Sequence, residues 1–191
     1  MGFLSILSFA HGLVRERVRP GDIVIDATMG NGHDTLFLAG LVGDKGHVYA
    51  FDVQEAALAS TRRRLDGAGI DAERVTLYLR DHADMLSTLP GEAAGRVAAV
   101  MFNLGYLPGG DHTVITRTDS TLRALDAAVG MLRSGGVVTV VVYPGHEGGA
   151  AEAAAVEEWA RCLPQGEYQT LSYKFLNQRN APPYVVAIEK R

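Results

Sequence analysis

The sequence predicts an α/β fold, a single doubly wound, Rossmann-like, mostly parallel seven-stranded sheet with helices on both faces. Two observations carry this prediction. Predicted strands and helices alternate along the chain and are joined by connections of a few residues. The central strands are nearly unbroken apolar runs, which is typical of parallel strands covered by helices on both sides.

The chain of 191 residues contains no internal repeat, low-complexity tract or linker, so we expect one domain over 1–191, with an N-terminal helix at 1–19 and the core at 20–191. The predicted strands are 22–26, 47–52, 74–79, 96–102, 137–143, 168–175 and 184–189. The last two alternate between apolar and polar residues, which indicates an edge or an antiparallel pair. The predicted helices are 33–41, 54–65, 84–89, 118–132 and 150–162, several of them followed by glycine.

Composition excludes several classes of protein. Cys162 is the only cysteine, which excludes disulfide frameworks, zinc fingers and iron–sulfur proteins and fits a reducing compartment. The net charge of -4 argues against binding nucleic acid by bulk charge, although a local basic patch stays open. No apolar run is long enough for a membrane span. The N-terminus is apolar first and basic second, the reverse of a secretory signal, so we expect a cytoplasmic protein without membrane contact.

A glycine-rich turn, Asp26-Ala-Thr-Met-Gly-Asn-Gly32, follows the first predicted strand. It lacks the Gly-Lys-Ser or Gly-Lys-Thr of a phosphate-binding P-loop. Thr35 stands where a dinucleotide fingerprint has its third glycine, which weakens a nicotinamide-binding interpretation. Gly30 and Gly32 would let the backbone approach a ligand closely, and Asp26 is expected to face a cationic group.

Acids also end the next two predicted strands. Asp52, about twenty residues after the glycines, is placed to accept both hydroxyls of a ribose. Asp81 is placed to accept from an adenine amino group. With Asp26, these acids indicate S-adenosylmethionine, whose sulfonium and amino groups are positively charged. Any one of them alone could equally cap the following helix.

In element order the chain resembles the class I S-adenosylmethionine-dependent methyltransferases over nearly its whole length. Thr28 departs from the pattern, because it stands where the usual motif has its first glycine. A narrower resemblance rests on Asp26-Ala-Thr-Met-Gly-Asn-Gly-His-Asp-Thr-Leu36, Phe51-Asp-Val-Gln54 and Asn103-Leu-Gly-Tyr-Leu-Pro-Gly-Gly-Asp-His112. These segments are similar to a small bacterial family labelled "putative rRNA methylase". The resemblance implies methylation of 5-aminomethyluridine, often 2-thiolated, at the tRNA wobble position, with the tRNA anticodon loop as partner.

The candidate cofactor residues come from the turn and from the strand ends. They are Asp26, Thr28, Gly30, Asn31, Gly32, His33, Asp34, Asp52, Gln54, Asp81, His82 and Asn103. His33 is expected to touch the carboxylate end of S-adenosylmethionine. Clustered metal-ligand spacing is absent from the sequence, so we predict no metal.

The segment from Asn103 to Tyr106 resembles the Asn-Pro-Pro-Tyr motif of methyltransferases that act on exocyclic amines. The Asn103 side-chain oxygen and the Leu104 carbonyl are expected to accept two amine N–H bonds, which would aim the nitrogen lone pair at the methyl group. Tyr106 is expected to stack on the base. An alkyl amine arrives mostly protonated, so a proton acceptor is needed.

The candidates for that acceptor are Asp111, His112, Tyr143 and His146, with His112 and His146 favoured because histidine titrates near neutral pH. Structural hydrogen bonding by these histidines is an equal alternative. The candidate catalytic residues are thus Asn103, Tyr106, Asp111, His112 and His146. His11, on the N-terminal helix, is interpreted as a packing residue.

Short basic clusters offer phosphate contacts, although each is more often a solvated face. The best placed is the loop after the sixth strand, so the candidate RNA-binding residues are Tyr106, Tyr143, Lys174, Asn177 and Arg179. The apolar N-terminal helix leaves a homodimer open.

Other functions stay in view. A methyltransferase acting on rRNA is one alternative. A methyltransferase acting on a small-molecule amine is another, and the acidic charge and the lack of an added RNA-binding domain favour it. A nicotinamide-dependent oxidoreductase and a binding protein without turnover fit less well, because of the missing third glycine and the Asn103–Tyr106 segment respectively.

Overall fold

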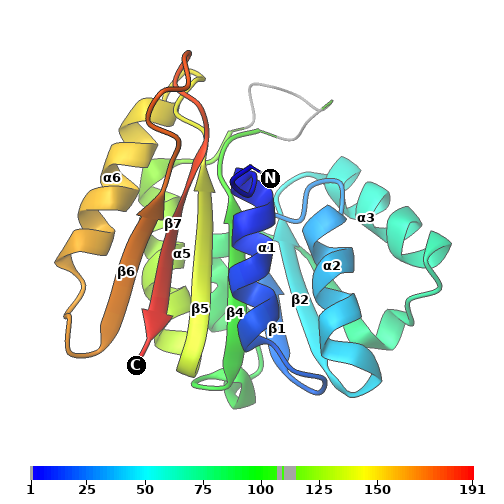
Figure 1. The fold of residues 1–191 in the computed structure, drawn as a ribbon. Coiled ribbons are helices and arrows are strands. Elements are labelled where there is room, and N and C mark those ends of the chain that lie inside the picture. Colours follow the sequence, from blue (N-terminus) through cyan, green and yellow to red (C-terminus); the bar gives the residue numbers. More distant parts are fainter. Residues whose placement is uncertain (1, 107–108, 110–114) are drawn as a thin grey trace.

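The computed structural model describes residues 2–106, 109 and 115–191. Within them, seven strands form one sheet in the order β3-β2-β1-β4-β5-β7-β6 (Figure 1). Their bounds are β1 (Ile23–Asp26), β2 (His47–Asp52), β3 (Val75–Leu79), β4 (Val97–Asn103), β5 (Leu132–Val142), β6 (Tyr168–Tyr173) and β7 (Tyr184–Lys190). β1 to β5 run parallel, and β7 is antiparallel to both of its neighbours, β5 and β6. The predicted fold class and the antiparallel pair are confirmed.

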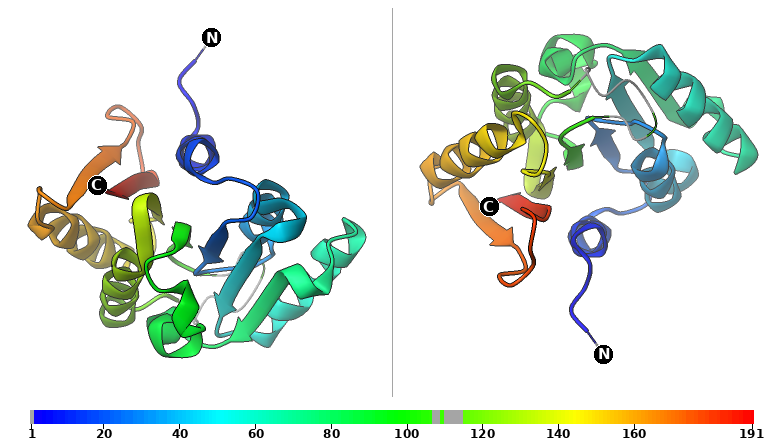
Figure 2. Two further views of the ribbon diagram at one scale, coloured as in Figure 1. Left: turned by 90° about the horizontal axis from the view of Figure 1, so that it is seen from below. Right: turned by 90° about the horizontal axis from the view of Figure 1, so that it is seen from above.

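Helices cover both faces of the sheet. They are α1 (Ile6–Arg17), α2 (His33–Val42), α3 (Glu55–Gly67), α4 (Met85–Thr88), α5 (Thr118–Met131) and α6 (Gly149–Cys162). Short 3-10 turns lie at η1 (Gly43–Lys45), η2 (Ala72–Arg74), η3 (His82–Asp84) and η4 (Gly91–Ala93). Figure 2 shows α1 and α2 on one side of the sheet and α5 and α6 on the other. Among the described residues, no helix is both long and apolar enough to cross a membrane.

Alternation along the strands explains why the apolar runs are nearly unbroken. Val24 and Met101 pack with α1, α2 and α3, whereas their neighbours Ile25 and Phe102 pack with α4, α5 and α6. Successive buried residues of a strand therefore pack on opposite faces of the sheet, as expected for a parallel sheet inside two helical layers. β4 lies at the centre, and all its residues except Asn103 are buried.

The N-terminal helix α1 crosses β4, β5 and β7 (Figure 1). Its last turns bury Val14 beside Val24, and its first turns bury Ile6 beside Val141 and Val185. Because α1 runs against the direction of the parallel strands, its first half lies near their carboxyl ends. That placement brings the middle of α1 to the edge where the candidate site residues gather.

β5 begins at Leu132, earlier than the predicted 137, because Leu132 already pairs with β4, ahead of an irregularity in which Gly135 has φ +71. The register between β4 and β5 shifts here, so that Val97 pairs with Leu132. A Cβ at position 136 would lie 2.9 Å from the Arg133 carbonyl oxygen and 3.0 Å from that of Val97. The glycine therefore permits a close approach of two strands where the sequence indicated a break.

Candidate functional site

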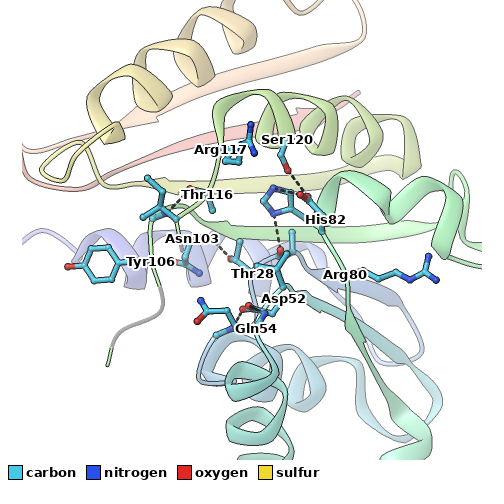
Figure 3. Close-up of a pocket in the computed structure, with 16 residues that line it drawn as sticks. Thr28, Asp52, Gln54, Arg80, His82, Asn103, Tyr106, Thr116, Arg117 and Ser120 are labelled. Carbon is cyan, nitrogen blue, oxygen red and sulfur yellow. Dashed lines mark hydrogen bonds and ion pairs between the residues drawn. The ribbon is translucent and has the colours of Figure 1, made fainter. Parts of the chain in front are cut away.

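Two adjoining cavities lie beyond the carboxyl ends of the strands. The smaller, of about 280 Å³, opens over β2, β3 and the start of α5, and the larger, of about 740 Å³, opens between α1, α2 and the β5–α6 connection. Figure 3 shows the residues of the smaller cavity, with Tyr106 and His82 at opposite ends. The residues that line both cavities are Thr28, Gly30, Asn103, Gly105 and Tyr106.

Thr28 joins the ends of β1 and β4. Its Oγ1 accepts a hydrogen bond of 2.7 Å from the backbone N–H of Asn103, and its own N–H donates to Asp26 Oδ1 at 3.2 Å (Figure 3). Glycine at this position would lack the hydroxyl. Threonine in place of the usual glycine therefore adds a hydrogen bond between the turn and the segment that begins at Asn103.

The two glycines of the turn play different parts. Gly32 has φ +76, and a Cβ there would lie 2.8 Å from Thr61 Cα on α3. The close approach at Gly32 is therefore to the protein's own helix, rather than to a ligand as the sequence indicated. Gly30 lines both cavities with φ +49, and its carbonyl accepts from the Thr61 hydroxyl at 3.1 Å.

Asp52 lies in the smaller cavity at the end of β2. Its Oδ2 accepts from the Gly30 N–H and its Oδ1 from the Gln54 N–H, each at 3.0 Å. Burial raises the pKa of Asp52, although the backbone hydrogen bonds oppose the shift. A carboxylate has about four acceptor positions, so both oxygens can still accept from a ligand.

Asp81 and His82 form the far end of the smaller cavity. Both the Ala83 N–H and the Ser120 hydroxyl donate to Asp81 Oδ1, at 2.8 and 2.5 Å, which leaves Oδ2 to accept from a ligand. Burial alone would raise the pKa of Asp81, but these hydrogen bonds outweigh it and lower the pKa. Burial lowers the pKa of His82, whose Nδ1 lies 3.2 Å from the Ala27 carbonyl oxygen, so His82 is neutral at pH 7.

Asp26 is fully buried beneath the turn and lines neither cavity. The Thr35 hydroxyl donates to its Oδ2 at 2.6 Å. Burial and the nearby Asp34 raise the pKa of Asp26 to about 7, although the hydrogen bonds from Thr35 and Thr28 oppose the shift. Asp26 thus supports the turn from below instead of facing a ligand directly.

The raised pKa of Asp26 makes folding sensitive to pH. Between about pH 4 and pH 7 the folded chain binds a proton at Asp26 that the unfolded chain has lost, so stability falls as pH rises. Asp26→Asn should remove this dependence. Relative to wild type, its free energy of unfolding should rise across that range, by roughly 4 kcal/mol at most. Chemical denaturation at a series of pH values measures it.

Asp44→Asn is the matched control, because the Asp44 side chain is 95% exposed. Its stability should follow wild type at every pH. The free energies of unfolding of wild type and Asp26→Asn are compared at each pH. A difference between them that stays constant from pH 4 to 7 would show that Asp26 is charged throughout.

Asn103, Asp34 and His11 form a hydrogen-bonded row in the larger cavity. Asn103 Nδ2 donates to Asp34 Oδ2 at 2.6 Å, and His11 Nε2 lies 2.7 Å from Asp34 Oδ1. Since a carboxylate only accepts, it fixes the amide with its nitrogen toward Asp34. The Asn103 oxygen is therefore the atom left to accept from a ligand, where the two cavities meet.

The segment after Asn103 is fastened on both sides. Tyr106 and Ile115 form an antiparallel bridge, and Gly105 and Thr116 exchange hydrogen bonds of 2.9 Å. The Thr116 hydroxyl in turn donates to the buried Glu152 at 2.7 Å. Gly105 has φ +133, which proline cannot adopt, and the Leu104 N–H donates to the Val141 carbonyl at 2.9 Å, for which proline has no donor; both account for the departure from Asn-Pro-Pro-Tyr. Tyr106 stays 42% exposed, with its ring at the cavity mouth.

Tyr143 and His146 line the larger cavity. Burial raises the pKa of Tyr143, and the charge of Asp34 adds to the shift. His146 Nδ1 contacts the Glu147 carbonyl oxygen at 2.8 Å, whereas its buried Nε2 has no hydrogen-bond partner among the described residues. The His146 ring meets Tyr106 edge to face at 5.9 Å. Asp111 and His112 lie outside the described residues.

Asn31 and His33, at the start of α2, also line the larger cavity, and Arg64 of α3 contacts both. The guanidinium donates from Nε to the Asn31 carbonyl at 2.6 Å, and its NH2 lies 2.9 Å from His33 Nε2. The sequence favoured a solvated helix face for Arg64, but its guanidinium lies at the rim of the larger cavity.

The candidate RNA residues of the β6–β7 loop lie outside both cavities. Lys174, Asn177 and Arg179 are exposed, and Lys174 Nζ lies 3.8 Å from Glu157. The same loop reaches the larger cavity through Ala181 and Pro183. Among the described residues, no group of three or more acids, histidines or cysteines has the arrangement of a metal site.

Sequence reasoning missed several residues at the site, among them His11, Glu152, Arg80 and Arg117. Arg80 follows β3 and Arg117 precedes α5, and both line the smaller cavity, with the Arg80 guanidinium directed away from the other labelled side chains (Figure 3). Arg80 could have been found from the sequence, because it directly precedes the candidate Asp81 at the end of a predicted strand. His11 and Glu152 reach the site from distant helices, and no local pattern marks them.

Comparisons with known proteins show the family of this chain. A family model described as "Putative rRNA methylase" matches residues 48–189. A chloroplastic tRNA (mnm5s2U34)-methyltransferase of Arabidopsis thaliana is 41% identical over 95% of this chain and 68% of its own length. A "putative rRNA-methylase" from Clostridium thermocellum has 41% identity and TM-score 0.95, and a "putative methyltransferase" from Streptococcus mutans in complex with SAH has 37% and 0.89. Both alignments cover 100% of each chain. The chain therefore belongs to this rRNA methylase family of methyltransferases.

Proposed function

We propose that this methyltransferase transfers a methyl group from S-adenosylmethionine to the aminomethyl nitrogen of 5-aminomethyluridine, or its 2-thio form, at the wobble position of tRNA. The observation that carries the proposal is the Asn103 amide, held by Asp34 with its oxygen available where the two cavities meet. The name of the Arabidopsis relative, which specifies U34 of tRNA, supports this substrate over rRNA.

The smaller cavity fits the adenosine part of S-adenosylmethionine. Asp52 would accept both ribose hydroxyls, and Asp81 Oδ2 would accept from the adenine amine beside the neutral His82 ring. The cofactor carboxylate would lie toward Asn31 and His33, where Arg64 supplies positive charge. When bound, S-adenosylmethionine supplies an electrophilic methyl group on a sulfonium.

The larger cavity would hold the amine. Asn103 Oδ1 and the Leu104 carbonyl accept its two N–H bonds and so direct the lone pair toward the smaller cavity. An alkyl amine with a pKa of about 10 arrives as an ammonium, which has no lone pair. His146 lines this cavity, and because its Nε2 has no hydrogen-bond partner among the described residues, we assign it the role of accepting the surplus proton.

Tyr106 and Tyr143 would contact the uridine base. The Tyr106 ring, 42% exposed at the mouth, would stack on the base. Bases of an anticodon loop are already unpaired, so a small protein needs no separate module to open a helix. Lys174, Asn177 and Arg179, exposed on a loop whose end lines the larger cavity, would contact phosphates. We place the reaction in the cytoplasm.

The decisive assay offers the enzyme and labelled S-adenosylmethionine two otherwise identical tRNAs, with and without the 5-aminomethyl group. Only the first should gain one methyl group, and nucleoside mass spectrometry should place it on the aminomethyl nitrogen. The rate should rise toward alkaline pH, as more of the amine becomes neutral.

Equal methylation of both tRNAs, or a methyl group on a ring atom or ribose, would refute the substrate. Parallel incubations with ribosomal RNA and with small alkyl amines distinguish the alternatives. Preferred labelling of either would replace the tRNA proposal without removing the methyltransferase activity.

A further inference from the structure

His11 reaches the site from an element that carries no recognised motif. It lies on α1, lines the larger cavity, and its Nε2 is 2.7 Å from Asp34 Oδ1. Its ring stacks on Phe37 of α2, with centroids 4.0 Å apart and planes inclined by 7°. Two independent contacts therefore fix both the plane of the imidazole and the direction of its Nε2.

The direction of the hydrogen bonds follows from Asp34. As a carboxylate, Asp34 has acceptors only, and its Oδ2 accepts from Asn103 Nδ2 at 2.6 Å. His11 must then carry a proton on Nε2 and donate it to Oδ1. With one donor on each oxygen, the carboxylate cannot turn without breaking a hydrogen bond. The side chain of Asp34 is only 11% exposed, so water gives little compensation for a lost donor.

We propose that His11 is a positioning residue for methyl transfer. By donating to Asp34 it holds the carboxylate that orients the Asn103 amide, and so keeps the amide oxygen aimed at the amine. This rests on the proposed function, in which Asn103 receives the amine. His11 itself touches neither the amine nor the methyl group in this mechanism.

The position of α1 explains why this task can fall to a helix outside the sheet. Val14 and Val18 pack into one core, and Ile6 and Ala10 into another, so α1 is anchored on both sides of His11. A rigid support matters, because small misplacements of a reacting pair cost large factors in rate. The helix that begins the chain thus supports the reaction at the end of β4.

Two substitutions separate the hydrogen bond from the packing. His11→Phe keeps a flat ring for stacking on Phe37 but removes the donor. His11→Gln keeps an N–H donor at a similar reach. We expect His11→Phe to lower kcat roughly tenfold, with the KM values for tRNA and S-adenosylmethionine within about twofold of wild type. His11→Gln should recover most of kcat.

His47→Phe is the matched control, because His47 forms a hydrogen bond with Thr76 on the sheet and lines neither cavity. Its kcat should equal that of wild type. Wild-type kcat in His11→Phe, or an equal loss in His11→Gln, would overturn the proposal. So would a loss that lies in KM alone.

A measurement without turnover separates this proposal from the substrate proposal. In ¹⁵N-labelled protein, the Asn103 side-chain amide signals can be identified by their loss in Asn103→Ala. We expect them to move toward solvent-exposed values in His11→Phe and to stay near wild-type values in His11→Gln. If they do not respond, the positioning role fails, whatever the substrate proves to be.

Discussion

Asn103→Ala is expected to lower the methyl-transfer rate on the order of a hundredfold while leaving the affinity for S-adenosylmethionine nearly intact. The substitution removes the amide oxygen that directs the amine, but the backbone N–H still donates to Thr28. The turn that holds the cofactor therefore keeps its support. Single-turnover rates at saturating tRNA and cofactor measure the chemical step, and calorimetry measures the cofactor.

Two results would contradict this role of Asn103. Full turnover in Asn103→Ala would show that the amine is oriented by other groups. A loss of cofactor affinity as large as the loss of rate would place Asn103 in cofactor binding instead.

Asp52→Ala is expected to weaken S-adenosylmethionine binding by roughly 2–4 kcal/mol, which corresponds to about thirtyfold to a thousandfold in Kd. The variant loses the carboxylate that would accept two ribose hydroxyls. It also loses the acceptor for the Gly30 N–H, so the turn itself is loosened. Calorimetric titration with S-adenosylmethionine and with its demethylated product should show the same loss, because both carry the ribose.

Asp71→Ala offers a close control for Asp52→Ala. Like Asp52, Asp71 accepts a hydrogen bond from the backbone N–H two positions further along the chain, here that of Glu73 at 2.9 Å. Unlike Asp52, it lines neither cavity. Its Kd should match that of wild type. Calorimetry that found NAD bound to the wild-type chain, and S-adenosylmethionine not bound, would refute the cofactor as a whole.

Much of the fold follows from local pattern. Unbroken apolar runs predicted the buried strands, and alternation over 168–175 and 184–189 predicted the antiparallel pair. Strand ends then locate the site, because parallel strands bring Asp52, Asp81 and Asn103 to one edge. The boundary of β5 was the exception. There, the apolar run starts only at Val137, but Leu132 already pairs with Val97 of β4, ahead of a shift in register.

The site itself was only partly predictable. Sequence patterns report on residues that are close along the chain. Asp34, however, contacts His11, which is 23 positions away, and Asn103, which is 69 positions away. The same limit explains Gly32, whose neighbour Thr61 lies on another helix. Asp26 had the expected place at a strand end, but burial beneath the turn depends on packing that no local pattern specifies.

The bridge between Tyr106 and Ile115 bears on how this enzyme can change its substrate. Its two sides are held by the hydrogen bonds that join Gly105, Thr116 and Glu152. The entropy cost of closing a longer connection grows only with the logarithm of its length, about 0.6 kcal/mol for each doubling. A connection of different length between the two bridge residues would therefore cost the bridge little. Substrate recognition can vary through the length of this connection while the bridge keeps Asn103 and Tyr106 in place.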